Sequence, residues 1–159
     1  MCSSDLGAHH EVRYFQVIKA GVHHIFVDHP SFHRPGIYGD SSGAYGDNLF
    51  RFALLSRAAL EVALKLPLSD GEVLGEETVF HVNDWHTALL PVYLEAVYRN
   101  AGRLLKAGTV LGLHNLGHHG SFAAHEFAGL DLSTRWWPSL DFHGNINLLK
   151  AGKIGRAHV

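Results

Sequence analysis

The stretch Thr-Val-Phe-His-Val-Asn-Asp-Trp-His-Thr-Ala-Leu-Leu-Pro, residues 78–91, decides the fold because it joins two structural patterns without a loop. Residues 78–82 form a short run of β-branched and aromatic residues, which is typical of a buried strand. From Trp85 the apolar residues follow helical spacing as far as Tyr98. A strand that passes directly into a helix indicates an α/β protein.

Two further apolar runs resemble the strand at residues 78–82. They cover residues 25–28 and 109–113, and a helical pattern over residues 47–66 follows the first of them after a Gly- and Pro-rich loop. Strands that alternate with helices are typical of a parallel sheet covered by helices. We therefore expect the three strands to lie parallel in one sheet, with the helices at 47–66 and 85–98 packed on it.

The composition fits one globular domain with a neutral ligand. The chain has 159 residues, of which 47% are hydrophobic and 18% charged, and its net charge is -2. This charge gives no basic field for nucleic acid or an anionic membrane surface. No apolar run approaches the ~20 residues that span a bilayer. We expect no nucleic-acid partner and no membrane segment, and the single cysteine, Cys2, suits a reducing compartment.

Polar residues stand where each predicted strand ends: Asp28, Asp84, His86, His114 and Asn115. In open parallel sheets, ligands bind beyond the carboxyl ends of the strands, so these residues are expected to face one cleft. Asp84 is placed to cap the following helix. His86 lies in the first helical turn, where the helix dipole favours a neutral imidazole that can hydrogen-bond a sugar hydroxyl. Asp84 as a simple cap and His86 as a simple surface histidine remain open alternatives.

Five strings, in order, resemble segments of the starch and glycogen synthases. They are Phe-Val-Asp-His-Pro (26–30), Tyr-Gly-Asp-Asn-Leu-Phe-Arg-Phe (45–52), Asn-Asp-Trp-His (83–86), His-Asn-Leu-Gly-His-His-Gly (114–120) and Asn-Ile-Asn-Leu-Leu-Lys-Ala-Gly (145–152). The resemblance covers residues 11–152, and its intervals are closest to plant-type starch synthases. Residues 1–8 and 153–159 fall outside it, and we expect them to be non-native or unstructured flanks.

The resemblance implies a Rossmann-like parallel sheet with flanking helices, as part of the N-terminal domain of a GT-B glycosyltransferase. It implies a retaining transfer of glucose from ADP-glucose to an α-1,4-glucan, without a metal or other cofactor. The nucleotide-binding parts of the family are not matched, so the chain alone is expected to be inactive. A plastid location is expected for a plant or algal source, and a cytoplasmic one for a bacterium.

The resemblance also assigns site residues. His86 would contact the donor glucose and Asp47 would lie at the acceptor or reaction centre, although Asp47 also fits a helix N-cap. Asn115, Asp84, His119 and Gly120 would bind substrate. The loop departs from the family at Gly117 and His119, where alanine and glutamine are usual.

Two other functions remain possible. Fourteen histidines raise the possibility of a metal-dependent hydrolase, although His-Glu-x-x-His is absent and adjacent strand histidines such as His23 and His24 point to opposite faces. A non-catalytic glucan-binding protein could instead stack sugars on an exposed Trp136, Trp137 and Phe142.

Overall fold

Parallel pairing joins β6 (Val79–Asn83) to β7 (Gly108–Gly112), with Val79 opposite Gly108 and Asn83 opposite Gly112. The computed structural model describes residues 2–5, 9–68 and 71–154. β6 alternates buried and exposed residues, and Phe80 and Val82 face the core. The parallel pair that the sequence predicts at 78–82 and 109–113 is confirmed, and so is the α/β class.

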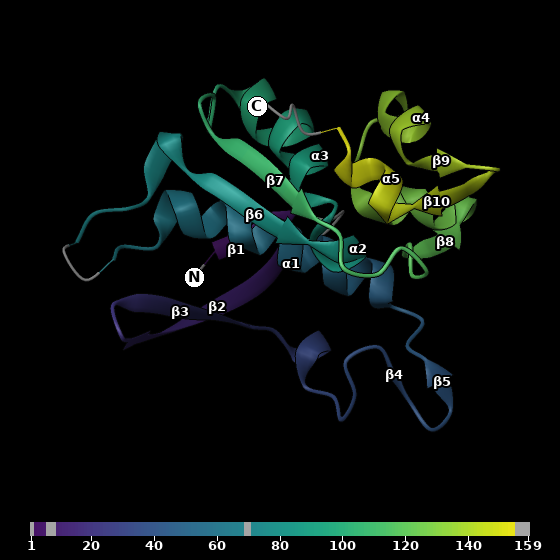
Figure 1. Ribbon diagram of the computed structural model, residues 1–159, viewed down its shortest axis with the longest axis horizontal. Coiled ribbons are helices and arrows are strands. Elements are labelled where there is room, and N and C mark those ends of the chain that lie inside the picture. Colours follow the sequence, from purple (N-terminus) through teal and green to yellow (C-terminus); the bar gives the residue numbers. More distant parts are fainter. Residues whose placement is uncertain (1, 6–8, 69–70, 155–159) are drawn as a thin grey trace.

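The other strands form small antiparallel units (Figure 1). One three-stranded sheet contains β1 (Cys2–Asp5), β2 (His9–Lys19) and β3 (Val22–Asp28), and another contains β8 (Ser121–Ala123), β10 (Asn145–Asn147) and β9 (Asp141–Phe142). The two-residue strands β4 (Gly39–Asp40) and β5 (Gly43–Ala44) pair within the long loop before α1.

The strand expected at residues 25–28 lies in β3, and its expected place in the parallel sheet is wrong. β3 pairs antiparallel with β2, with Phe15 opposite Phe26. The turn between them consists of Ala20 and Gly21, both with positive φ (50° and 76°). This backbone matches the twist of a two-residue hairpin, so local pairing with the preceding strand prevails.

The long helix α1 (Asn48–Lys65) is the centre of the core and confirms the helix expected at 47–66. Its buried side chains lie on all sides, and Ala53, Leu54, Leu60 and Ala63 are fully inaccessible. It packs against α2, α3 and β1. A helix buried all round is a core helix.

The helix expected at 85–98 is divided into α2 (Asp84–Thr87), α3 (Leu90–Tyr93) and the π-helical turn η3 (Leu94–Tyr98). Pro91 explains the first break, because it has no N–H to donate to the carbonyl of Thr87. No helix among the described residues is both long and apolar enough to cross a membrane.

Short helices complete the described chain. They are η1 (Pro30–Phe32), η2 (Gly75–Glu77), η4 (Arg99–Ala101), η5 (Ala124–Leu130), η6 (Thr134–Trp136), α4 (Trp137–Leu140) and α5 (Leu148–Gly152). Trp136 and Trp137, expected to be exposed, are half-buried against the core, whereas Phe142 is exposed.

The structure describes parts of both flanks that are expected to be non-native or unstructured. Cys2–Asp5 form β1 and pair with residues 9–12 of β2, so this part of the predicted unstructured flank is a strand. At the other end, Ile154 packs against the core and donates its N–H to the Ala151 carbonyl. The rest of the predicted flanks, residues 1, 6–8 and 155–159, lie outside the described residues.

Candidate functional site

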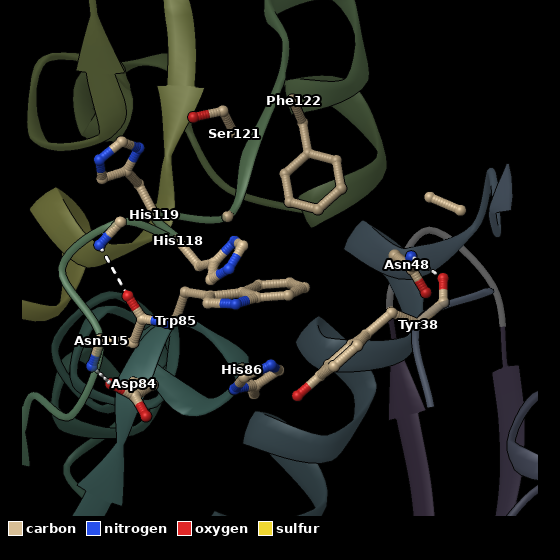
Figure 2. A pocket seen from close by; sticks show the side chains of 13 residues that line it. Tyr38, Asn48, Asp84, Trp85, His86, Asn115, His118, His119, Ser121 and Phe122 are labelled. Atoms are coloured by element: carbon tan, nitrogen blue, oxygen red, sulfur yellow. Dashed lines mark hydrogen bonds between the residues drawn. The ribbon is translucent and has the colours of Figure 1, made fainter. Parts of the chain in front are cut away.

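A pocket of about 630 Å³ lies at the carboxyl ends of β6 and β7 (Figure 2). Its walls come from the start of α2, the loop between β7 and β8, and the loop that carries β4 and β5. The lining residues are Tyr38, Ala44, Asn48, Asp84, Trp85, His86, Asn115, Gly117, His118, His119, Gly120, Ser121 and Phe122. The expected cleft at the end of the parallel strands is therefore present, and it contains Asp84, His86, Asn115, His119 and Gly120.

Asp84 joins the ends of the two parallel strands and does not cap its own helix. Its Oδ1 accepts hydrogen bonds from the backbone N–H groups of His114 (2.7 Å) and Asn115 (3.3 Å). These hydrogen bonds, chiefly that from His114, hold the pKa of the carboxyl below its ordinary value. The residue has a φ of 51°, and the N-cap position falls on Asn83. Asp84 thus fixes the β7–β8 loop against the start of α2.

His86 is enclosed by aromatic rings. Its imidazole stacks on Tyr38, with ring centroids 5.1 Å apart at 25°, and meets Phe52 edge to face at 5.0 Å. Desolvation by burial is the main cause that lowers the pKa of His86, and His118 adds to it while Asp84 opposes it. The Nε2 atom is buried and has no hydrogen-bond partner among the described residues. Burial therefore favours the neutral form of His86, and Nε2 is a buried polar atom without a partner in a residue that lines the pocket.

The β7–β8 loop closes the pocket opposite Tyr38. The Asn115 Oδ1 accepts the backbone N–H of Gly117 (2.9 Å) and shapes the turn. Gly120 has a φ of 64°, and a Cβ there would lie 2.6 Å from Cε3 of Trp85, so only glycine lets the loop cross the indole. The carbonyls of His119 and Gly120 accept the backbone N–H groups of the first two residues of α5. The loop is therefore held by Asp84 at its start and by α5 at its end.

Aromatic side chains that sequence reasoning missed form much of the pocket wall. The ring of Trp85 lies 5.9 Å from Tyr38 and 6.2 Å from Phe122, measured between centroids. Aromatic faces suit the apolar faces of sugar rings. Tyr38 and Asn48 could have been suspected from their position in, or directly after, the Gly- and Pro-rich loop, because such loops carry function more often than core. Phe122 has no comparable signal in the sequence.

Asp47, expected at the acceptor or reaction centre, and Asp28, expected in the cleft, lie outside the pocket lining. Asp47 occupies the N-cap position of α1 without a capping hydrogen bond, and its carboxylate instead binds Arg34 through two hydrogen bonds of 2.7 and 2.6 Å. It lines a separate hollow beside Glu126. Asp28 hydrogen-bonds to His33 (2.5 Å) at the end of β3. It is absent from the pocket lining because β3 pairs with β2 and is not part of the parallel sheet.

His114 lies beside the pocket, outside its lining. Its Nε2 is 3.0 Å from Oδ1 of Asn83, so it joins the strand ends in the same way as Asp84. Within residues 2–5, 9–68 and 71–154, no group of three or more His, Cys, Asp and Glu side chains is arranged to hold a metal ion.

Comparison with known proteins gives one consistent result. A family model described as the starch synthase catalytic domain matches residues 2–155. Soluble starch synthase 1 of Oryza sativa subsp. indica is 46% identical over 137 residues, which are 86% of this chain and 21% of that protein. Starch synthase 1 of Arabidopsis thaliana is 47% identical over 132 residues, 82% of this chain and 20% of the relative. This chain spans about a fifth of the length of these relatives.

Among solved structures, the fold is similar to the catalytic domain of starch synthase IV from Arabidopsis thaliana bound to ADP and acarbose. The TM-score is 0.72 at 25% sequence identity, and the match covers 96% of this chain and 30% of that one. The similarity therefore extends over nearly all of this chain's fold.

Proposed function

This chain belongs to the starch synthase catalytic-domain family, and we propose that the protein containing it transfers glucose from ADP-glucose to an α-1,4-glucan. The observation that carries the proposal is the pocket at the carboxyl ends of β6 and β7. It combines a neutral imidazole that has a free nitrogen with aromatic walls and a glycine-bearing loop. These features suit an uncharged sugar ring, which needs hydrogen bonds and apolar contact but no counter-charge.

We assign the glucosyl unit of the donor to this pocket. His86 hydrogen-bonds a sugar hydroxyl through Nε2, and the loop from Asn115 to Gly120, with His119 and Asp84, lines the same unit. During transfer, the bond from glucose C1 to the diphosphate oxygen breaks and ADP leaves with the electron pair. The acceptor hydroxyl forms the new bond to C1 and gives its proton to the departing diphosphate oxygen. Contacts that strengthen as positive charge develops on the sugar ring accelerate this step.

The proposal includes retention of configuration at C1 and requires no metal or cofactor. The group that stabilises the leaving diphosphate is expected in the parts of the family that this chain does not span. The relatives from rice and Arabidopsis are named as chloroplastic or amyloplastic proteins. We accordingly propose a plastid location if the source is a plant or an alga, and a cytoplasmic one if it is a bacterium.

The test is the steady-state rate of ADP release by the full-length protein that carries this chain, with ADP-glucose and a maltooligosaccharide. His86→Ala is expected to lower turnover by about 10²-fold or more, the typical loss for one donor to a reacting centre. His125→Ala is the matched control, because His125 is an exposed histidine of η5 outside the pocket. Its rate is expected to equal that of the unaltered protein.

The alternatives give different results in the same assay. A protein that binds maltooligosaccharide but releases no ADP would be a non-catalytic glucan-binding protein. Hydrolysis that stops on addition of a chelator would indicate a metal-dependent hydrolase. A folded His86→Ala protein with unchanged turnover would remove the assignment of His86.

A further inference from the structure

One wall of the sugar pocket is made by a loop whose backbone is bound to α1. Tyr38 belongs to this loop, and its ring stacks on the imidazole of His86. The carbonyl of Tyr38 accepts two hydrogen bonds, from the backbone N–H of Tyr45 (2.8 Å) and from Nδ2 of Asn48 (2.8 Å). Asn48 is the first residue of α1 and itself lines the pocket. The position of the Tyr38 ring therefore depends on bonds that its own backbone makes with α1.

Arg51 is the residue of α1 to which this loop is tied. Its side chain is 3% exposed. Its Nε donates to the carbonyl of Ser31 (2.9 Å), and its Nη1 donates to the carbonyl of Ile37 (2.8 Å) and to Oδ1 of Asn48 (2.6 Å). One guanidinium thus binds the two ends of segment 31–37 and the side chain that holds Tyr38.

The chemistry of the Arg51 site is unusual for a buried cation. All three hydrogen-bond partners are oxygens of neutral groups, two backbone carbonyls and one side-chain amide. The guanidinium carbon also lies over the rings of Tyr45 (5.3 Å) and Phe52 (5.5 Å). A buried cation is costly unless its donors are satisfied, and hydrogen bonds from a charged donor are stronger than those between neutral groups. The arrangement therefore fixes the loop firmly at this point.

We propose that Arg51 is a positioning residue that holds Tyr38 against His86, acting through Asn48 and the backbone of Ile37, and so fixes the imidazole in the sugar pocket. Arg51 itself does not line the pocket. The inference rests on the proposed function, because it assigns Arg51 a part in the reaction at that site. The inference adds Arg51, which lies outside the pocket, to the residues on which the reaction depends.

Loss of the Arg51 contacts has two consequences. The Tyr38 ring withdraws, which exposes His86 to water and raises the pKa of its imidazole toward the ordinary value, because burial is the main cause of its lowered pKa. The other titratable groups that act on His86 are Asp84 and His118, and neither is bonded to the Arg51 loop: Asp84 binds the His114 N–H, and the backbone N–H of His118 binds the Asn115 carbonyl. The imidazole is also less well oriented toward the sugar, and a misplacement of about 1 Å costs about 100-fold in rate.

The experiment compares Arg51→Met with Arg57→Met in the full-length protein that carries this chain. Arg57 is the matched control, because it is a buried arginine of the same helix whose partners, Asp131 and the ring of Tyr93, lie outside the pocket. For each variant we measure the midpoint of thermal unfolding, kcat and KM for ADP-glucose and maltooligosaccharide, and the pKa of His86. The pKa comes from NMR of isotope-labelled histidine, assigned with His86→Asn.

Both substitutions are expected to lower the unfolding midpoint. Only Arg51→Met is expected to raise the pKa of His86 and to lower kcat/KM, by about 100-fold. Arg51→Lys, which keeps the charge but not the forked geometry, is expected to recover part of the loss. Should Arg51→Met fail to fold, Asn48→Ala cuts the bond to the Tyr38 carbonyl and removes one of the three acceptors of Arg51 while the arginine itself stays in place, and the same pKa rise is expected.

Two results overturn the inference. One is a folded Arg51→Met or Asn48→Ala protein with the His86 pKa and kcat/KM of the unaltered protein. The other is an equal change of both quantities in Arg57→Met, which indicates general loosening of the core. Failure of the proposed function looks different, because then even the unaltered protein releases no ADP from ADP-glucose, while the pKa of His86 still reports whether Arg51 positions Tyr38.

Discussion

Gly120→Ala tests whether the β7–β8 loop crosses the indole of Trp85. A Cβ at Gly120 would lie 2.6 Å from Cε3, 2.9 Å from Cδ2 and 3.0 Å from Cβ of Trp85. The residue also has a φ of 64°, which costs an alanine about 1–2 kcal/mol. Overpacking of this kind costs about 1–3 kcal/mol more. The free energy of unfolding is therefore expected to fall by about 2–5 kcal/mol.

Two other glycines separate these contributions. Gly144 has a φ of 82° with no atom within 4 Å of a built Cβ, so Gly144→Ala is expected to cost only the backbone part, about 1–2 kcal/mol. Gly129 has neither a positive φ nor a close neighbour, so Gly129→Ala is expected to stay within about 1 kcal/mol of the unaltered protein.

The assay is urea unfolding of the full-length protein that carries this chain, with each substitution repeated in a Trp85→Ala background. Removal of the indole should bring the Gly120→Ala cost down toward that of Gly144→Ala, because it removes the two ring carbons of the clash and leaves only the Cβ of residue 85 at 3.0 Å. A Gly120→Ala protein as stable as Gly144→Ala in the presence of Trp85 would refute the close approach of loop and indole.

Three further predictions concern Asp84 and three histidines, His29, His86 and His118. Folding stability is expected to decrease as pH falls below about 6.5, because the pKa values of His86 and His29 are lowered in the folded state and the unfolded chain binds protons first. Unfolding of His86→Gln at several pH values checks this, since the variant should show a weaker dependence of the unfolding free energy on pH. Asp84→Ala is expected to lower the thermal unfolding midpoint more than Asp84→Asn does, because asparagine keeps an acceptor for the His114 N–H and tolerates the positive φ, and calorimetry of both variants decides it. His118→Ala is expected to slow turnover with ADP-glucose less than His86→Ala does, since His118 lines the pocket without the aromatic enclosure of His86; equal losses in the ADP-release assay would contradict this ranking.

The parallel pair and the central helix could be predicted because their patterns are local and long. Residues 78–82 and 109–113 are short runs rich in β-branched and apolar residues, and α1 repeats its apolar spacing over 18 residues. The partner of residues 25–28 could not be predicted in the same way. Alternation with helices predicts pairing with the other two strands, whereas the turn at Ala20 and Gly21 favours the preceding strand. An alanine at a position of positive φ is not a typical hairpin signal in a sequence.

For the candidate site, the location of the residues could be predicted from the sequence, but their hydrogen-bond partners could not. Residues directly after β6 and β7 could be placed because the topology brings those strand ends together, and Asp84, His86 and Asn115 indeed line one pocket. Their partners could not be read from the chain. Asp84 accepts from residues 30 and 31 positions away, and Asp47 binds Arg34 across a loop. Both carboxylates lie at the start of a helix, and for an aspartate at such a position the sequence pattern predicts only an N-cap hydrogen bond.

The central claim is that the glucosyl unit of the donor occupies the pocket at the carboxyl ends of β6 and β7. A crystal structure of the full-length protein that carries this chain, with ADP-glucose and a maltooligosaccharide bound, tests it directly. We expect a sugar hydroxyl within hydrogen-bonding distance of Nε2 of His86, with the ring near the loop from Asn115 to Gly120. A glucosyl unit bound outside this pocket, for example in the hollow beside Asp47, would contradict the claim.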